Sequence, residues 1–383
     1  MSTTLQEMMN EATRLTRAGK LQEAAAAIQQ ALGTSIPSST PNPTVPSDAA
    51  DLLSRAWPSW APPAATNQDP NVLDGCVFET PASGTRASET TTTKPTDAAQ
   101  AATGSGEFIS GTHSRASMTR QYKLYVPPDH VGKSLPLVLM LHGCTQNPDD
   151  FAAGTRMNEF ARSQGFFVLY PAQSQDANPS RCWNWFKHTH QRRGSGEPAL
   201  LADMTQSVIR KYGIDSRRVY VAGLSAGGAM AAIVAGLYPE VFAAAGVHSG
   251  LASGAASSLP EALNAMKNGA QTTGAAAARA PVRTIVFHGD QDSTVHARNG
   301  EQAFTAALGA NRGTPRVEQG ASRSGRRYTR TVQIGDDGTV RAEHWLVHGA
   351  GHAWSGGSAD GSYTDATGPD ATAEMLRFFF AGH

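Results

Sequence analysis

Uninterrupted apolar runs alternate with segments of helical periodicity after about residue 130, and this alternation restricts the chain to few folds. A run without polar residues is typical of a strand buried on both faces, as in a parallel sheet. Such runs occur at residues 135–141, 166–170, 219–222, 242–247 and 282–287. The helical segments are residues 149–163, 198–212, 226–237, 259–268 and 297–308. This order predicts an α/β fold with a doubly wound, mostly parallel sheet and right-handed crossovers.

Further patterns extend the predicted sheet at both ends. Residues 122–126 alternate between apolar and polar side chains and precede two prolines, which indicates a half-buried edge strand. The Gly-Asp-Asp-Gly sequence at 335–338 predicts a hairpin between strands at 328–334 and 340–347. Helical periodicity returns at 369–380, so we expect a closing helix there.

The N-terminal part of the chain has a different character. Residues 1–33 contain two short amphipathic patterns separated by a glycine, which predicts a helical hairpin. Residues 34–106 are rich in Pro, Ser, Thr and Ala without a sustained period, which is typical of a disordered, low-complexity linker. Residues 107–383 then form the expected α/β domain.

Charge and composition exclude several classes of protein. The 32 Lys and Arg balance the 32 Asp and Glu, so no overall charge favours nucleic acid as a partner. Residues 219–239 lack charged side chains over a length that would span a membrane, but their glycines favour a strand and a helix, so no transmembrane segment is expected. No phosphate loop, dinucleotide fingerprint or metal-ligand spacing occurs, so we expect no cofactor and no metal.

The compartment is predicted mainly from the N-terminus, while a Cys144–Cys182 bridge would favour export. Residues 1–33 lack a basic region followed by an apolar one, so they do not read as a secretory signal. The expectation is therefore a cytoplasmic protein, with an extracellular one as the alternative.

A Gly-x-Ser-x-Gly sequence lies between a buried run and an Ala-rich helical segment. It spans Gly223 to Gly227 and places Ser225 at the turn. In this context the serine is held in a strained conformation at the start of a helix, which is typical of a catalytic nucleophile. The amide N–H of Ala226, at the positive end of the helix, is expected to stabilise an oxyanion.

A nucleophilic serine requires a base and an acid, and both follow it in the chain. Asp290 and Asp292 come directly after the run at 282–287; we prefer Asp292 as the acid, while Asp290 has the alternative role of holding the turn. His352 lies in a glycine-rich loop after the strand at 340–347 and is the predicted base. The order Ser225, Asp292, His352 is that of an α/β-hydrolase.

Two other segments are predicted to border the site. Cys144 follows the run at 135–141, and its N–H is expected to be the second oxyanion donor; its thiol is either inert or bridged to Cys182. The aromatic residues Trp183 and Trp185 are expected to bind substrate, with core packing as the alternative.

These motifs together resemble the polyhydroxybutyrate depolymerase family of α/β-hydrolase esterases, which is similar to feruloyl and acetylxylan esterases. The resemblance covers about residues 122–380 and rests on six motifs, beginning at Leu141, Cys182, Gly223, Tyr238, His288 and Gly349. It implies a Ser225, Asp292 and His352 triad, Cys144 and Ala226 as oxyanion donors, and Trp183 or Trp185 at the substrate.

The sequence therefore predicts a cofactor-free serine esterase. The implied partner is an ester substrate, with short-chain hydroxyacyl esters such as poly(3-hydroxybutyrate) or its oligomers first. The alternatives are a feruloyl or acetylxylan-type carbohydrate esterase, a peptidase or acyltransferase with the same machinery, and a non-catalytic binding protein with a hydrolase fold.

Overall fold

A computed structural model describes residues 104–271, 282–309 and 313–381. The predictions of a helical hairpin at 1–33 and of a linker at 34–106 fall outside these residues, apart from the last three of the linker. Residue 107, the expected start of the α/β domain, is the first residue of strand β1.

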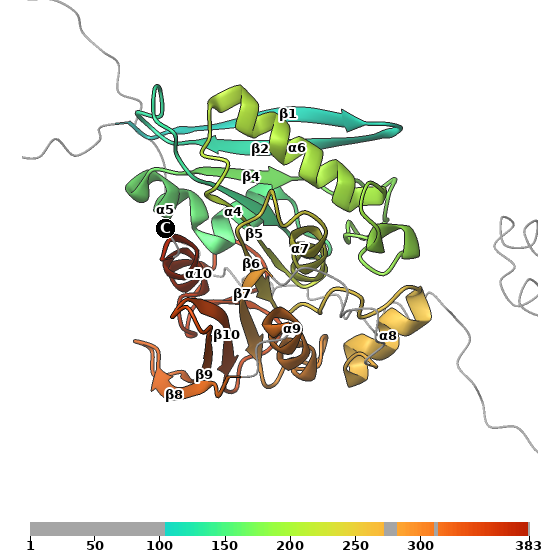
Figure 1. The fold of residues 1–383 in the computed structure, drawn as a ribbon, viewed down its shortest axis with the longest axis vertical. Helices are drawn as coiled ribbons and strands as arrows, with labels where there is room; N and C mark the ends of the chain where they lie inside the picture. Colours follow the sequence, from blue (N-terminus) through green and yellow to red (C-terminus); the bar gives the residue numbers. More distant parts are fainter. Residues whose placement is uncertain (1–103, 272–281, 310–312, 382–383) are drawn as a thin grey trace, which may run out of the picture. The chain divides into compact units, whose positions relative to one another are not determined.

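A ten-stranded sheet forms the centre of the described domain, in the order β1-β2-β4-β3-β5-β6-β7-β10-β9-β8 (Figure 1). Its strands are β1 (Glu107–Arg115), β2 (Met118–Val126), β3 (Leu137–Leu141), β4 (Phe167–Pro171), β5 (Val219–Leu224), β6 (Ala244–His248), β7 (Arg283–Gly289), β8 (Arg316–Ala321), β9 (Arg327–Ile334) and β10 (Val340–Val347). The strands from β4 to β10 in this order are parallel, whereas β1, β2, β9 and β8 are antiparallel to their neighbours. The predicted mostly parallel α/β sheet is confirmed.

Helices cover both faces of the sheet (Figure 1). One face carries α6 (Gly196–Tyr212), α7 (Ala226–Leu237) and α9 (Arg298–Leu308), and the other carries α4 (Pro148–Thr155), α5 (Met157–Gln164) and α10 (Ala371–Phe380). Smaller elements are α8 (Leu259–Asn268), the 3₁₀ turn η1 (His188–Gln191) and the short strands β11 (Trp354–Ser355) and β12 (Thr364–Asp365). Because both faces are covered, the central strands β3 to β6 are buried along their whole length, which explains their uninterrupted apolar sequences.

Aromatic packing joins the sheet to the closing helix. Tyr220 of β5 stacks on Phe379 of α10, with ring centroids 4.9 Å apart and planes inclined by 2°. Burying an aromatic side chain of this size contributes about 1.5–3 kcal/mol relative to its exposure. The periodic apolar residues of the closing helix are therefore what hold it against the parallel strands.

The structure differs from the sequence-based prediction at the sheet edges. The strand at 122–126 was expected at an edge, but β1 pairs outside it, so β2 is internal. At the other end β8 extends the predicted hairpin. Both added strands alternate exposed and half-buried residues and are rich in polar side chains, so they lack the apolar runs that revealed the central strands.

One predicted helix is divided. The segment expected as a single helix at 149–163 forms α4 and α5, because Arg156 adopts a left-handed conformation with φ of 56°. Its backbone N–H closes α4 by bonding to the carbonyls of Ala152 and Ala153. Asn147 begins α4, since its side chain accepts bonds from the N–H groups of Asp149 and Asp150.

The uncharged stretch at 219–239 contains β5 and α7. Within the residues that the structure describes, no helix combines the length and the apolar character that crossing a bilayer would require.

Because the central strands are parallel, the candidate site residues lie at one edge of the sheet. The carboxyl ends of β3, β5, β7 and β10 lie at one edge of the sheet, because these strands run in the same direction. The loops that follow them carry Cys144, Ser225, Asp292 and His352. Crevices at this edge are where ligands bind in open α/β sheets.

Candidate active site

Ser225 occupies a strained turn between β5 and α7. Its φ of 58° and ψ of −121° lie in a region that non-glycine residues rarely adopt. The turn is possible because glycines stand on either side of it: a Cβ at Gly227 would lie 2.0 Å from the carbonyl oxygen of Leu141, and one at Gly223 would lie 2.4 Å from the backbone of Gly227. Strain of this kind costs about 1–3 kcal/mol and persists only where the surrounding structure enforces it.

Two amide groups beside the turn have no hydrogen-bond acceptor among the residues that the structure describes. Within the described parts of the chain, the N–H of Ala226, the first residue of α7, and the N–H of Cys144, in the loop after β3, make no hydrogen bond. The loop after β3 lies against the turn, since a Cβ at Gly143 would be 3.6 Å from the carbonyl oxygen of Leu224. Free N–H groups next to a helix N-terminus favour a developing negative charge.

Asp292 and His352 form a hydrogen-bonded pair. Nδ1 of His352 lies 2.7 Å from Oδ2 of Asp292 and donates to it, which leaves Nε2 as the unprotonated nitrogen of the neutral ring. Oδ1 of Asp292 accepts bonds from the N–H groups of Thr294 and Val295. Asp290 points elsewhere: it bonds to Nδ1 of His348 at 2.9 Å and to the N–H of Gly349 at 2.7 Å.

Asp292 is held in its ionised form. Burial alone would raise its pKa, but hydrogen bonds from His288 and His352 and the electrostatic interaction with these two rings outweigh burial and bring the pKa well below its usual value. Nε2 of His288 lies 3.4 Å from Oδ2 of Asp292 and donates to the carbonyl of Val295 at 2.7 Å. A carboxylate that stays charged can orient His352 and stabilise a proton on it.

Ser225 and His352 are connected through His248. Neither Oγ of Ser225 nor Nε2 of His352 forms a hydrogen bond with any described residue, so the two do not bond directly here. The carbonyl of His248 accepts the N–H of Ser225 at 2.8 Å, and Nε2 of His248 accepts the N–H of Ser355, three residues after His352, at 2.9 Å. Catalytic hydrogen bonds are often long before substrate binds, and this link keeps the two loops together.

His248 and His288 were missed by the sequence-based reasoning. Both are buried at the carboxyl ends of strands, His248 on β6 and His288 on β7. Burial, together with the nearby rings of His288 and His352, lowers the pKa of His248 to about 3, so this histidine is neutral. A polar residue at the end of an otherwise apolar run next to the serine strand was the signal that could have found His248.

The expected exposed aromatic surface is not found. Trp183 has no exposed surface and Trp185 is 5 % exposed, so both side chains pack inside the protein, as the alternative interpretation had it. Their loop is instead joined to the loop after β3, because Cys144 and Cys182 form a disulfide. The disulfide leaves no free thiol beside Ser225 from these two residues.

A polar hollow of about 840 Å³ opens beside the loop after β3. Its walls come from the β1–β2 hairpin, the end of β4 and the start of α4, and carry hydroxyl, amide and charged groups. They include Thr112, Gln121, Asn147, Gln175 and Arg181. His142, the residue after β3, belongs both to this wall and to the backbone packed against Gly227.

Metal binding has no support from the side chains that are described. Within those residues, no three His, Cys, Asp or Glu side chains are grouped in a way that could hold a metal ion.

A mostly parallel sheet covered on both faces, with a strained serine between strand and helix, defines an α/β-hydrolase fold. The sequence profile of the family described as "Esterase PHB depolymerase" matches residues 120–332. The chain belongs to this esterase family.

Individual relatives agree with the family. Poly(3-hydroxyalkanoate) depolymerase C of Paucimonas lemoignei is 31% identical over 239 residues, covering 59% of this chain and 56% of the relative. Feruloyl esterase B of Neurospora crassa is 36% identical over 138 residues, covering 35% of this chain and 46% of the relative. The chain thus spans about half the length of these relatives. An acetyl xylan esterase structure from Aspergillus awamori shares the fold, with a TM-score of 0.55 and 23% identity over 68% of this chain and 93% of that one.

The buried, neutral His344 should make the free energy of unfolding decrease at acidic pH. Burial lowers the pKa of His344 to about 4, against about 6.5 in the unfolded chain, so protons bind the unfolded state first as the pH falls below 6.5. This contribution to stability is complete above pH 6.5 and decreases towards pH 4, by about 2 kcal/mol at pH 5. We expect His344→Leu to reduce the loss of unfolding free energy between pH 7 and 5 by about that amount in urea titrations. An unchanged pH dependence would contradict the prediction.

Proposed function

We propose that this protein is a serine esterase in which Ser225 is the nucleophile, His352 the base and Asp292 the acid. Nε2 of His352 takes the Oγ proton while Oγ attacks the ester carbonyl carbon, and the N–H groups of Cys144 and Ala226 bind the oxyanion. The protonated His352 then gives its proton to the departing alcohol oxygen. Water, deprotonated by the same ring, hydrolyses the acyl-enzyme and restores Ser225.

The observation that carries this proposal is the 2.7 Å bond between Nδ1 of His352 and Oδ2 of Asp292. Asp292 is buried, is held below its usual pKa and contacts a second histidine, so it has the environment that a triad acid requires. The strained backbone of Ser225 and the free N–H groups next to it support the same assignment. Family membership supports ester hydrolysis as the reaction.

Short-chain hydroxyacyl esters, such as oligomers of 3-hydroxybutyrate, are the first candidate substrates. The support is the match to a relative named poly(3-hydroxyalkanoate) depolymerase C, which covers 59% of this chain.

Carbohydrate esters are the second candidate, and the polar hollow favours them. Amide and hydroxyl groups such as those of Gln121, Gln175 and Thr112 match the hydroxyl groups of a sugar better than they match an aliphatic polyester. Relatives named feruloyl esterase and acetylxylan esterase point the same way.

We expect Ser225→Ala to lose about 10³-fold or more of its turnover of a short p-nitrophenyl ester, with the melting temperature nearly unchanged. A fluorophosphonate probe should label the unmodified protein and not the variant. Ser253→Ala, in the loop after β6 and outside the proposed triad, is the control and should keep both properties. A hydrolase-fold binding protein would show neither turnover nor labelling.

The two aspartates provide a separate test of the acid. Asp292→Asn removes the carboxylate that holds His352, so kcat should fall about 10³-fold or more. Asp290→Asn disturbs contacts to His348, Gly349 and Gln291 but none to His352, and we expect a loss below about 10-fold. If Asp290→Asn lowers kcat for the same p-nitrophenyl ester more than Asp292→Asn does, Asp290 is the acid of the triad.

A substrate panel separates the two candidate classes. It compares kcat/KM for 3-hydroxybutyrate oligomers, feruloylated oligosaccharides and acetylated xylo-oligosaccharides. If sugar esters occupy the hollow, Gln175→Leu should lower kcat/KM for the oligosaccharides by about 3- to 30-fold and leave p-nitrophenyl acetate unaffected. Equal effects on all esters would argue against a sugar in the hollow.

A further inference from the structure

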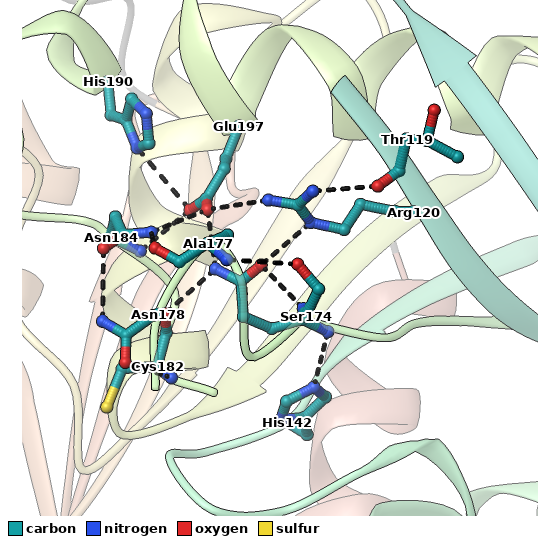
Figure 2. Close-up of polar contacts among 11 residues, drawn as sticks. Thr119, Arg120, His142, Ser174, Ala177, Asn178, Cys182, Asn184, His190 and Glu197 are labelled. Carbon is teal, nitrogen blue, oxygen red and sulfur yellow. Dashed lines mark hydrogen bonds and ion pairs between the residues drawn. The ribbon is translucent and has the colours of Figure 1, made fainter. Parts of the chain in front are cut away.

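Glu197 is a buried carboxylate that the proposed mechanism does not use. It is the second residue of α6 and is 1 % exposed. Its side chain is surrounded by donors from separate segments (Figure 2). Oε1 accepts Nε2 of Gln173 at 2.6 Å and Nδ2 of Asn184 at 2.9 Å and lies 3.4 Å from Nη2 of Arg120, while Oε2 accepts the N–H of Asn184 at 2.8 Å.

Apart from Arg120, which lies in β2, these donors belong to irregular segments outside the strands of the sheet. Gln173 follows β4, Asn184 lies in the loop that carries Cys182, and Nδ1 of His190 in η1 lies 3.6 Å from Oε2. Nε2 of Gln173 also donates to the carbonyl of Cys182 at 3.0 Å. Figure 2 shows the carboxylate of Glu197 between Arg120, Asn184 and His190. A single buried charge therefore holds the end of β4 and the Cys182 loop together.

From these segments three connections lead to the loop after β3. Cys182 is bonded to Cys144 through the disulfide. The carbonyl of Ser180 accepts the N–H of Thr145 at 2.7 Å. The N–H of Gln173 donates to Nε2 of His142 at 3.1 Å. Cys144 thus lies between anchored residues on both sides.

His142 links Gln173 to the peptide group between Gly143 and Cys144. Because its Nε2 accepts a bond, the proton of the neutral ring is on Nδ1, which donates to the carbonyl of Gly143 at 2.7 Å. Burial lowers the pKa of His142 to about 4, so the ring is neutral near pH 7. The Gly143 carbonyl and the Cys144 N–H belong to one planar peptide group, so holding the carbonyl orients the N–H.

We infer that Glu197 is a positioning residue that acts through Gln173 and His142 on the Gly143–Cys144 peptide group, and so aims the Cys144 N–H at the oxyanion. This inference rests on the proposed function, which makes that N–H an oxyanion donor. It adds a residue about fifty positions away in the sequence to the determinants of the reaction. A carboxylate suits the role because it only accepts hydrogen bonds, and Arg120, Gln173 and Asn184 all donate to it.

The test is Glu197→Gln, which conserves volume but introduces an NH₂ group that faces donors. A misoriented Cys144 N–H should stabilise the transition state less while binding of the ester stays nearly the same. We therefore expect kcat to fall about 10- to 100-fold and KM to change less than about 3-fold. The affinity of a trifluoromethyl ketone, which mimics the tetrahedral oxyanion, should fall with kcat/KM. Amide hydrogen exchange of peptide 142–146 should become faster.

Glu343→Gln is the matched control. Glu343 is fully buried in β10 and accepts bonds from Arg330, Arg377 and Nε1 of Trp345, so its loss should lower the melting temperature comparably. It makes no contact with residues 142–146 among the described interactions, and kcat and the exchange of that peptide should stay within about 3-fold of the unmodified protein. If Glu197→Gln does not fold, Gln173→Met removes the same link from its other end and keeps the backbone N–H that reaches His142.

The outcomes separate the two ideas. If Ser225→Ala abolishes turnover while Glu197→Gln and Gln173→Met behave like Glu343→Gln, the positioning role is overturned and the esterase proposal stands. If the unmodified protein hydrolyses no ester, the proposed function fails, and with it the role of the Cys144 N–H. Faster amide exchange of peptide 142–146 in Glu197→Gln, without a fall in kcat, would show that Glu197 stabilises this loop but does not affect the reaction. That outcome would also overturn the inference.

Discussion

The close approach of β5, α7 and the backbone after β3 is the constraint on which the rest of the site depends. Only glycine at 223 and 227 lets these three backbones meet. Their contact holds Ser225 at a positive φ, places it at the start of α7 and brings the loop of Cys144 beside it. The parallel sheet then supplies Asp292 and His352 from strands that end at the same edge. Local strain at one serine is thus maintained by the packing of the whole domain.

Buried polar groups around the site are organised by directed hydrogen bonds. His142 and His248 each accept a backbone N–H at Nε2, which places the proton of the neutral ring on Nδ1. Asp292 and Glu197 are both buried acids, and both are surrounded by donors. In a low-dielectric interior an unpaired polar group is costly, so these networks favour one arrangement of the loops over others.

The sequence predicted what local patterns encode, and missed what depends on long-range contacts. Apolar runs revealed the central strands, and the glycine spacing revealed Ser225, because both are short-range signals. The strands β1 and β8 are polar and half exposed, and Glu197 looks like an ordinary first-turn acid of a helix, so nothing local marks them. The burial of Trp183 also depends on the whole fold. The disulfide between Cys144 and Cys182 is one of the two options that the sequence left open, because spacing alone does not show which thiols meet in the fold.

The hollow next to the loop after β3 is bounded partly by the β1–β2 hairpin, which lies at the outer edge of the sheet and away from β5, the strand that leads to Ser225. Substitutions at the exposed residues of that hairpin should leave the glycine contacts and the Asp292–His352 pair in place, whereas Arg120 of β2 is buried and contacts Glu197. The polar groups that could contact a bound molecule and the groups proposed to act on an ester are thus carried mostly by different elements of the sheet, so the one set can change while the other keeps its geometry.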